Sequence, residues 1–202
     1  MKALLVNGSP HAAGNTFRAL EEVAAALQAG DVETEILQLG VKPVRGCIAC
    51  GRCSELGRCA FADDVANTIL EKALAADALV LGSPVYYAQP NGALLAVMQR
   101  VCYAAAGRLR GKPAASVAVC RRGGASAAFQ SLNMFFGILG MPVAGSQYWN
   151  IAYGCAPGEV AQDAEGLQTM RLLGRNLAWM AKNLKSGVPA PEQPWLMTNF
   201  IR

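Results

Sequence analysis

Four closely spaced cysteines are the residues of this chain whose types and spacing point most clearly to chemistry. Cys47, Cys50, Cys53 and Cys59 follow the pattern C-x2-C-x2-C-x5-C and are four of the seven cysteines in the sequence. The pattern is more compact than the separated pairs of a zinc ribbon and is close to the C-x2-C-x2-C run that ligates a cubane iron–sulfur cluster. It therefore predicts a [4Fe-4S] cluster with these four thiolates as its metal ligands.

Other roles for these thiols stay open on the sequence alone. Four sulfurs can also ligate zinc, although the compact spacing disfavours it. The thiols can equally be free, or form a redox-sensing pair. Of the remaining cysteines, we expect Cys102 on a helix and Cys155 in a loop to be small buried apolar residues, and Cys120 to be buried at the end of a strand.

The amino-acid composition indicates a single globular domain and disfavours nucleic-acid-binding and membrane proteins. The chain has 202 residues, 53% hydrophobic and 16% charged, with a net charge of +4, which suits one domain with a large core. Lysines and arginines are scattered without interleaved aromatic residues, so we expect no nucleic-acid partner. The short apolar run at the N-terminus predicts no signal peptide, and the sequence predicts no membrane span. We therefore expect a cytoplasmic protein, in which clustered cysteines serve as metal ligands or redox thiols.

The elements that must position these residues alternate along the chain. Apolar runs predict strands at 2–7, 33–39, 77–83, 114–120 and 141–149, and helical spacing predicts helices at 16–29, 63–76, 91–105, 125–139 and 158–184. Such alternation predicts an α/β fold: a doubly wound five-stranded parallel sheet of order 2-1-3-4-5 with helices on both faces. We expect one domain over 1–184, a cysteine loop at 44–60 after the second strand, and an extended tail at 185–202.

The loop after the first strand has the composition of a phosphate site. Residues 8–16 read Gly-Ser-Pro-His-Ala-Ala-Gly-Asn-Thr and lead directly into a helix. Glycines let backbone N–H groups turn inward, Ser9, Asn15 and Thr16 offer side-chain donors, and a helix N-terminus attracts anions. The loop lacks both Gly-Lys-Ser/Thr and G-x-G-x-x-G, so a monophosphate fits best. A simple capped turn is the alternative, and His11, the only histidine, either donates to the phosphate or faces solvent.

Two further loops belong to the same expected sheet edge. Residues 83–92 carry Pro84, Tyr86 and Tyr87, a stiff aromatic platform suited to a planar ring, or alternatively a subunit contact. Residues 120–126 join Gly123 and Gly124 to a pair of arginines. These arginines can serve a flavin, a pyridine-nucleotide phosphate, or solubility alone.

These motifs resemble a known family. Gly8-Ser9-Pro10…Gly14-Asn15-Thr16, Gly82-Ser83-Pro84-Val85-Tyr86, Tyr148-Trp149-Asn150, Asp163-Ala-Glu-Gly166 and the terminal Thr198-Asn-Phe-Ile-Arg202 are similar to the flavodoxin-like NAD(P)H-dependent FMN reductases. The cysteine motif resembles the iron–sulfur flavoprotein branch of that family. The resemblance covers nearly the whole chain.

The resemblance implies non-covalent FMN and a homodimer or tetramer. The residues expected to bind the cofactor are Ser9, His11, Gly14, Asn15, Thr16, Pro84, Val85, Tyr86, Tyr87, Arg122, Gly123 and Gly124. We expect Asp63 and Asp64 to cap a helix rather than to form an acid pair.

The absence of an obvious acid–base pair agrees with chemistry carried by a flavin. The expected function is an FMN-dependent oxidoreductase that takes electrons from NAD(P)H or ferredoxin. It would pass them to a small-molecule acceptor such as a quinone, directly or through the cluster. A non-catalytic electron carrier resembling flavodoxin and a cysteine-loop redox sensor are the alternatives.

Overall fold

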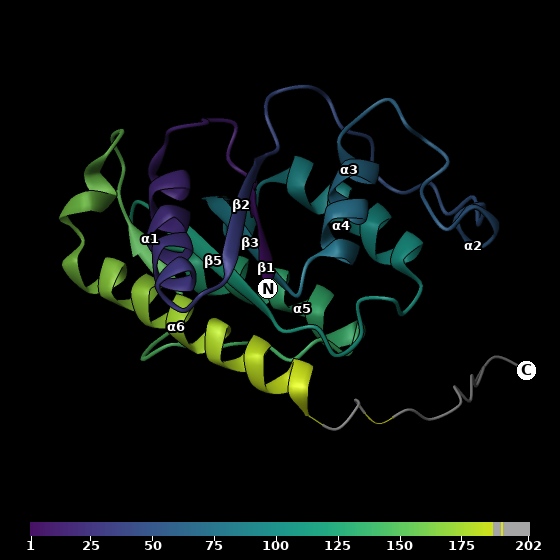
Figure 1. Cartoon of the computed structure of the whole chain (residues 1–202). Coiled ribbons are helices and arrows are strands. Elements are labelled where there is room, and N and C mark those ends of the chain that lie inside the picture. Colours follow the sequence, from purple (N-terminus) through teal and green to yellow (C-terminus); the bar gives the residue numbers. More distant parts are fainter. Residues whose placement is uncertain (188–190, 192–202) are drawn as a thin grey trace, which may run out of the picture.

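The computed structural model describes residues 1–187 and 191, and its centre is a parallel sheet (Figure 1). The strands are β1 (Lys2–Asn7), β2 (Glu33–Gln38), β3 (Ala78–Tyr86), β5 (Ala114–Cys120) and β6 (Ile151–Tyr153), in the order β2-β1-β3-β5-β6. The short β4 (Gln89–Pro90) pairs antiparallel with the end of β3. Because β4 lies off the main path, the predicted order 2-1-3-4-5 of five parallel strands is confirmed.

Helices cover both faces of the sheet. One face carries α1 (Asn15–Ala29) and α6 (Ala164–Ser186), and the other carries α3 (Ala66–Ala75), α4 (Gly92–Ala105) and α5 (Ala125–Ile138). The alternation of side chains along β1 explains the two cores: Leu5 packs toward α1 and α6, whereas Leu4 and Val6 pack toward the other face. Two short elements, α2 (Cys53–Leu56) and the 3₁₀ helix η1 (Glu159–Gln162), lie in the loops.

The prediction of a strand at 141–149 is wrong. Ala114 pairs with Val143 in an isolated bridge, after which the chain leaves the sheet and returns at Ile151 as β6. Between Val143 and Ile151, side chains make hydrogen bonds in place of strand pairing. The Ser146 hydroxyl donates to Asn150 Oδ1 over 2.8 Å, and the Asn150 side-chain amide donates to the Ala144 carbonyl over 3.5 Å. These side-chain hydrogen bonds hold the segment in a turn.

Three other elements differ from the prediction by more than one residue. The third strand does not end at 83, because Pro84 still pairs with Val119 and the strand continues to Tyr86. The helix expected from 63 begins at Ala66, since Asp64 accepts a hydrogen bond from the Ala66 N–H instead of lying within the helix. The last helix ends at Ser186, two residues later than expected, and its loose start is η1. Most of the predicted tail lies outside the described residues.

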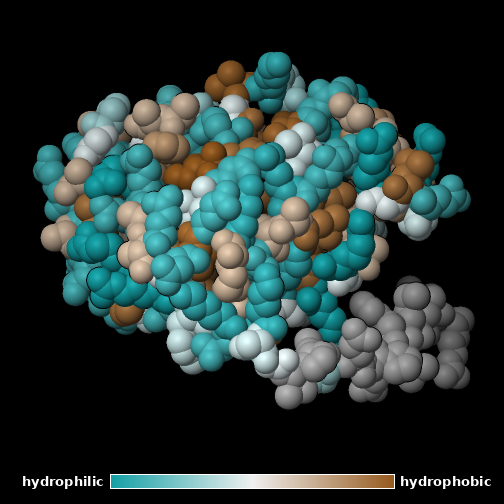
Figure 2. Space-filling model, viewed as in Figure 1, coloured by the Kyte–Doolittle hydropathy of each residue, from teal (hydrophilic) through white to brown (hydrophobic). Residues whose placement is uncertain are grey.

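The surface is mainly hydrophilic with scattered apolar patches, as Figure 2 shows for one face. Large exposed apolar side chains also occur along α5 and the segment before β6, namely Met134, Ile138, Val143, Tyr148 and Trp149. Within the described part of the chain, none of the helices is both long enough and apolar enough to span a membrane.

Candidate functional site

The loop after β1 is held in shape by two amide side chains that stand at the ends of neighbouring strands. Asn7 Oδ1 accepts from the Ser9 N–H over 3.1 Å, and Asn7 Nδ2 donates to Gln38 Oε1 over 2.5 Å. Gln38 Nε2 in turn donates to the Ser9 carbonyl over 2.6 Å. Ser9 Oγ accepts from the His11 N–H over 3.1 Å, while the His11 side chain is exposed. Asn7 and Gln38 were missed from the sequence because they were read only as strand residues.

The helices that begin at the predicted cofactor loops start differently from two others. In the described structure α1 begins after Gly14 and α5 after Gly124, neither with a capping side chain. By contrast, Asn91 caps α4 and Asp163 caps α6 through their side-chain oxygens. An uncapped helix start leaves backbone N–H groups free for an anion. The uncapped start of α1 therefore suits a phosphate, whereas at the start of α5 the Ala125 backbone N–H already bonds to Cys120.

The loop after β3 is a tight hairpin. Tyr87 and Ala88 both have positive φ, +50° and +63°, and connect β3 to β4. Tyr86 is partly exposed and Tyr87 fully exposed, while Pro84 and Val85 are half-buried. Two successive non-glycine residues in the left-handed region store strain, which is typical of functional loops. The hairpin presents the aromatic residues at the sheet edge, as a ring platform requires.

The hairpin touches the loop after β5. A Cβ on Gly124, whose φ is +85°, would lie 2.9 Å from the Ala88 Cα. Cys120 is buried as predicted, and its pKa is raised by burial, although hydrogen bonds from the backbone of Arg122 and Ala125 oppose that rise. The Arg122 side chain is exposed. The glycines thus permit close contact between two predicted cofactor loops.

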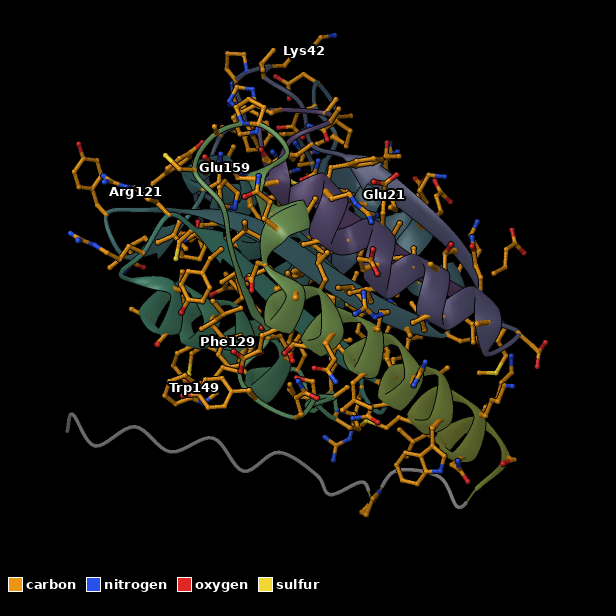
Figure 3. All side chains as sticks on the ribbon, turned by 90° about the vertical axis from the view of Figure 1, so that its left-hand side faces the viewer. Glu21, Lys42, Arg121, Phe129, Trp149 and Glu159 are labelled. Atoms are coloured by element: carbon orange, nitrogen blue, oxygen red, sulfur yellow. The ribbon has the colours of Figure 1, made fainter. Side chains whose placement is uncertain are left out.

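Loops from distant parts of the sequence meet at this edge. Lys42, Arg121 and Glu159 follow β2, β5 and β6, and Figure 3 shows them spread over the end of the molecule where these parallel strands finish. The carboxylate of Glu159 accepts from the Cys155 and Ala156 N–H groups at 2.7 and 2.8 Å. These bonds lower the pKa of Glu159 below its usual range and shape the loop that follows β6.

Asn15 has protein partners for both the nitrogen and the oxygen of its side-chain amide. Its Nδ2 donates to the Ala156 carbonyl over 2.9 Å, and its Oδ1 accepts from the Val160 N–H over 3.3 Å. Asn15 therefore joins the start of α1 to the loop after β6. Neighbouring Thr16 is buried at the first turn of α1. A role of Asn15 in binding phosphate stays a prediction, whereas its bracing of the loop is a contact of the structure.

The four cysteines of the motif line a single small cavity. Its walls are completed by Ile48, Ala49, Gly51, Ala60, Phe61, Arg100 and Tyr103. Cys47, Cys53 and Cys59 are half-buried and Cys50 is exposed, and none of the four is in a disulfide. Over residues 1–187 and 191, no three His, Cys, Asp or Glu side chains are arranged for a single metal ion. A cubane cluster requires a donor set of this kind, four thiolates that each bind a different iron.

The cysteine loop begins at the end of β2 and extends outward with α2 beside α4 (Figure 1). It is held by Arg100 of α4 and by Arg108, which lies three residues after α4 ends. Arg100 is almost completely buried and donates from Nε to Cys59 Sγ over 3.2 Å, and Arg108 donates to the Gly57 carbonyl. Asp64, expected only to cap a helix, also pairs with Arg100. Arg100 was missed from the sequence because it lies on a helix 41 residues beyond Cys59.

The two other cysteines differ from one another. Cys102 is largely buried on α4, and burial raises its pKa to about 12. Cys155 is exposed, so the expectation that it is buried is wrong. It lies in the polar loop shaped by Glu159, which leaves its side chain at the surface.

Comparison with known proteins now decides the family. The family model of the NADPH-dependent FMN reductases matches residues 1–155, which include the loops after β1, β3 and β5 and the cysteine motif. The chain belongs to the NADPH-dependent FMN reductase family. Within this family it falls in the iron–sulfur flavoprotein branch, as the curated relatives show.

Relatives of this FMN reductase family member carry the name iron-sulfur flavoprotein. One from Methanocaldococcus jannaschii is 37% identical over 193 residues, which cover 92% of this chain and 100% of that protein. Another from Methanosarcina thermophila is 28% identical and covers 88% of this chain and 93% of that protein. The first matches along its entire length, so the cysteine loop falls within the similarity.

Solved structures confirm the fold of this family member. RosB bound to 8-demethyl-8-formylriboflavin-5'-phosphate has a TM-score of 0.71 at 17% identity, over 100% of this chain and 94% of that one. A flavodoxin from the domain Archaea has a TM-score of 0.62 at 18% identity, over 91% of this chain and 100% of that one. The predicted flavodoxin-like fold is therefore confirmed.

Proposed function

We propose that this protein is an FMN-dependent oxidoreductase that accepts electrons from NAD(P)H or reduced ferredoxin and passes them to a small acceptor such as a quinone. We further propose a [4Fe-4S] cluster on Cys47, Cys50, Cys53 and Cys59 as its one-electron site. The observation that carries the proposal is the gathering of these four thiols around one cavity in a flavoprotein fold. The relatives named iron-sulfur flavoprotein support it.

The residues proposed to hold FMN divide into two groups. The uncapped start of α1, with Ser9 and Thr16 nearby, would receive the phosphate, because its free N–H groups and helix dipole favour an anion. The hairpin residues Tyr86 and Tyr87, with Gly124 opposite, would flank the ring. Bound FMN would supply the hydride and single-electron chemistry. The protein would orient the cofactor, and backbone N–H groups at the start of α5 would stabilise negative charge at its polar edge.

We also propose a homodimer or tetramer in the cytoplasm. The exposed apolar side chains of Met134, Ile138, Tyr148 and Trp149 support a subunit contact, because monomers rarely expose such residues in one region. The cysteine loop extends away from the sheet (Figure 1), so a neighbouring subunit can bring a second flavin to it. Mass measurement in solution by light scattering tests this assembly, and a monomer would contradict it.

The proposal is tested by cofactor analysis after purification without oxygen. We expect bound FMN and about four irons with acid-labile sulfide per chain, together with oxidation of NADH or NADPH. Cys53→Ser should lose iron and keep FMN, because Cys53 lines the cysteine cavity. Cys155→Ser is the matched control, since Cys155 is exposed and outside that cavity. It should keep both cofactors.

The possible failures are distinct. If the purified protein contains FMN but no iron, the proposed cluster is refuted and the protein is a two-electron reductase. If flavin-loaded protein is not reduced by NADH, NADPH or reduced ferredoxin, the oxidoreductase proposal fails. Rapid reduction without turnover of any acceptor would favour an electron carrier instead.

A further inference from the structure

Among residues 1–187 and 191, Arg100 is the largest of the fully buried side chains, and its guanidinium faces the cysteine loop. Its side chain is 1% exposed, and its ion-pair partner Asp64 is 7% exposed. A buried arginine is tolerated only when its donors are paired, because an unpaired buried charge is strongly destabilising. The hydrogen-bond partners of Arg100 therefore indicate which segments this side chain holds in place.

Those partners come from both ends of the cysteine loop. Nη1 donates to the Arg45 carbonyl over 3.3 Å, two residues before the first cysteine of the motif. Nη2 donates to the Phe61 carbonyl over 3.0 Å, two residues after the last. One planar side chain thus joins the entrance and exit of the loop. A lysine, which has a single nitrogen, cannot span these positions.

The third contact is to a sulfur of the site. Nε of Arg100 donates to Cys59 Sγ over 3.2 Å. The other sulfur of the motif with a hydrogen bond in the described chain is that of Cys47, which accepts from the Ala49 backbone N–H over 3.4 Å. Cys59 therefore differs from Cys47 in that its sulfur accepts a hydrogen bond from a charged side chain. Bonds from a cation to a thiolate are stronger than neutral ones and stabilise added negative charge.

We propose that Arg100 is the positioning residue of the four-cysteine site, closing the loop at both ends, and that its hydrogen bond to Cys59 raises the reduction potential of a cluster bound there. The inference rests on the proposed cluster. Hydrogen bonds to cluster sulfurs are among the factors that set the potential, because reduction adds negative charge to the cluster and a cationic donor favours that charge.

The test compares variants that distinguish the loss of the contact between Arg100 and Cys59 from the loss of the Arg100–Asp64 ion pair and from misfolding. Arg100→Gln alone would leave Asp64 buried without its cation, so it is combined with Asp64→Asn, and Asp64→Asn alone is the reference. Arg108→Gln is the matched control, because Arg108, just beyond the end of α4, also reaches the loop but contacts only backbone carbonyls. Each full-length protein is purified without oxygen and its iron is counted.

The deciding measurement is the midpoint potential of the cluster from a titration followed by EPR. We expect the double variant to be more negative than Asp64→Asn alone, and Arg108→Gln to match the wild type. Release of iron to a chelator should be about 10- to 100-fold faster in the double variant. Equal potentials in the double variant and in Asp64→Asn would overturn the potential-setting role.

A second measurement needs no cluster. Hydrogen exchange of the peptide 45–61 in cluster-free protein should be faster in the double variant than in Asp64→Asn, because both ends of the loop lose a donor. Unchanged exchange would overturn the closure role. A wild-type protein that binds FMN but no iron would refute the proposed cluster and, with it, the potential-setting role, while exchange would still decide closure.

Discussion

Gly124 and Ala88 lie so close that a side chain on the glycine would collide with the backbone of the alanine. A Cβ at Gly124 would stand 2.9 Å from the Ala88 Cα, and Gly124 has a φ of +85°. The two residues belong to the loop after β5 and to the β3–β4 hairpin. Their contact brings together the two loops proposed to flank the flavin ring.

The first prediction is that Gly124→Ala weakens both folding and flavin binding. The positive φ and the collision should lower the free energy of unfolding by about 1–3 kcal/mol. FMN affinity should fall about tenfold or more, because displacement of the hairpin costs at least 1.4 kcal/mol. Gly137→Ala on α5 is the control, since a Cβ there also meets no atom within 4 Å. Equal flavin affinities of the two variants, measured by fluorescence titration, would refute the contact's importance.

The second prediction concerns Asn15 and separates bracing from phosphate binding. Asn15→Ala removes the hydrogen bonds to Ala156 and Val160, so FMN-free protein should lose about 1–2 kcal/mol of unfolding free energy in urea. Gln28→Ala, which removes an exposed hydrogen bond from the same helix to Thr34, should change it by less than about 0.5 kcal/mol. If Asn15 serves the phosphate alone, FMN-free Asn15→Ala will be as stable as the wild type and only its FMN affinity will fall.

The third prediction is a pH dependence at Glu35. Hydrogen bonds from Lys72 and Lys2 lower the pKa of this carboxyl and join β2 to α3 and β1. Because the folded pKa is below the unfolded value of about 4.3, the stabilisation is complete above that pH. It is lost as the pH falls through the folded pKa. Glu35→Gln should therefore flatten the acid side of the stability profile measured by urea unfolding, and an unchanged slope would contradict this role of Glu35.

The fourth prediction is that Cys102 resists alkylation. Its pKa of about 12 leaves it about three orders of magnitude less thiolate at pH 8 than an ordinary exposed thiol has. Mass spectrometry after iodoacetamide treatment should find Cys155 labelled and Cys102 unlabelled in the folded protein. Both should be labelled in urea. Equal labelling before unfolding would show that α4 opens readily.

Local sequence determined most of the secondary structure and the nature of the cofactor loops. The apolar run at 2–7 can bury all of its side chains only as a central strand, and β1 has those bounds. The glycines around Ser9 and after Cys120 mark loops that precede helices, and α1 and α5 begin there. The spacing of the four cysteines likewise placed them on one loop, because thiols so close in sequence stay close in space.

Tertiary structure decided the features whose partners are remote in sequence. Asn15 contacts a carbonyl 141 residues away, and the four partners of Arg100 follow from the way α4 packs beside the cysteine loop. The last strand is short and begins at Ile151, because a hydrogen bond between the Ser146 and Asn150 side chains holds the preceding segment in a turn. Local secondary-structure propensity does not predict such hydrogen bonds, since they form only when the sheet has brought distant segments together.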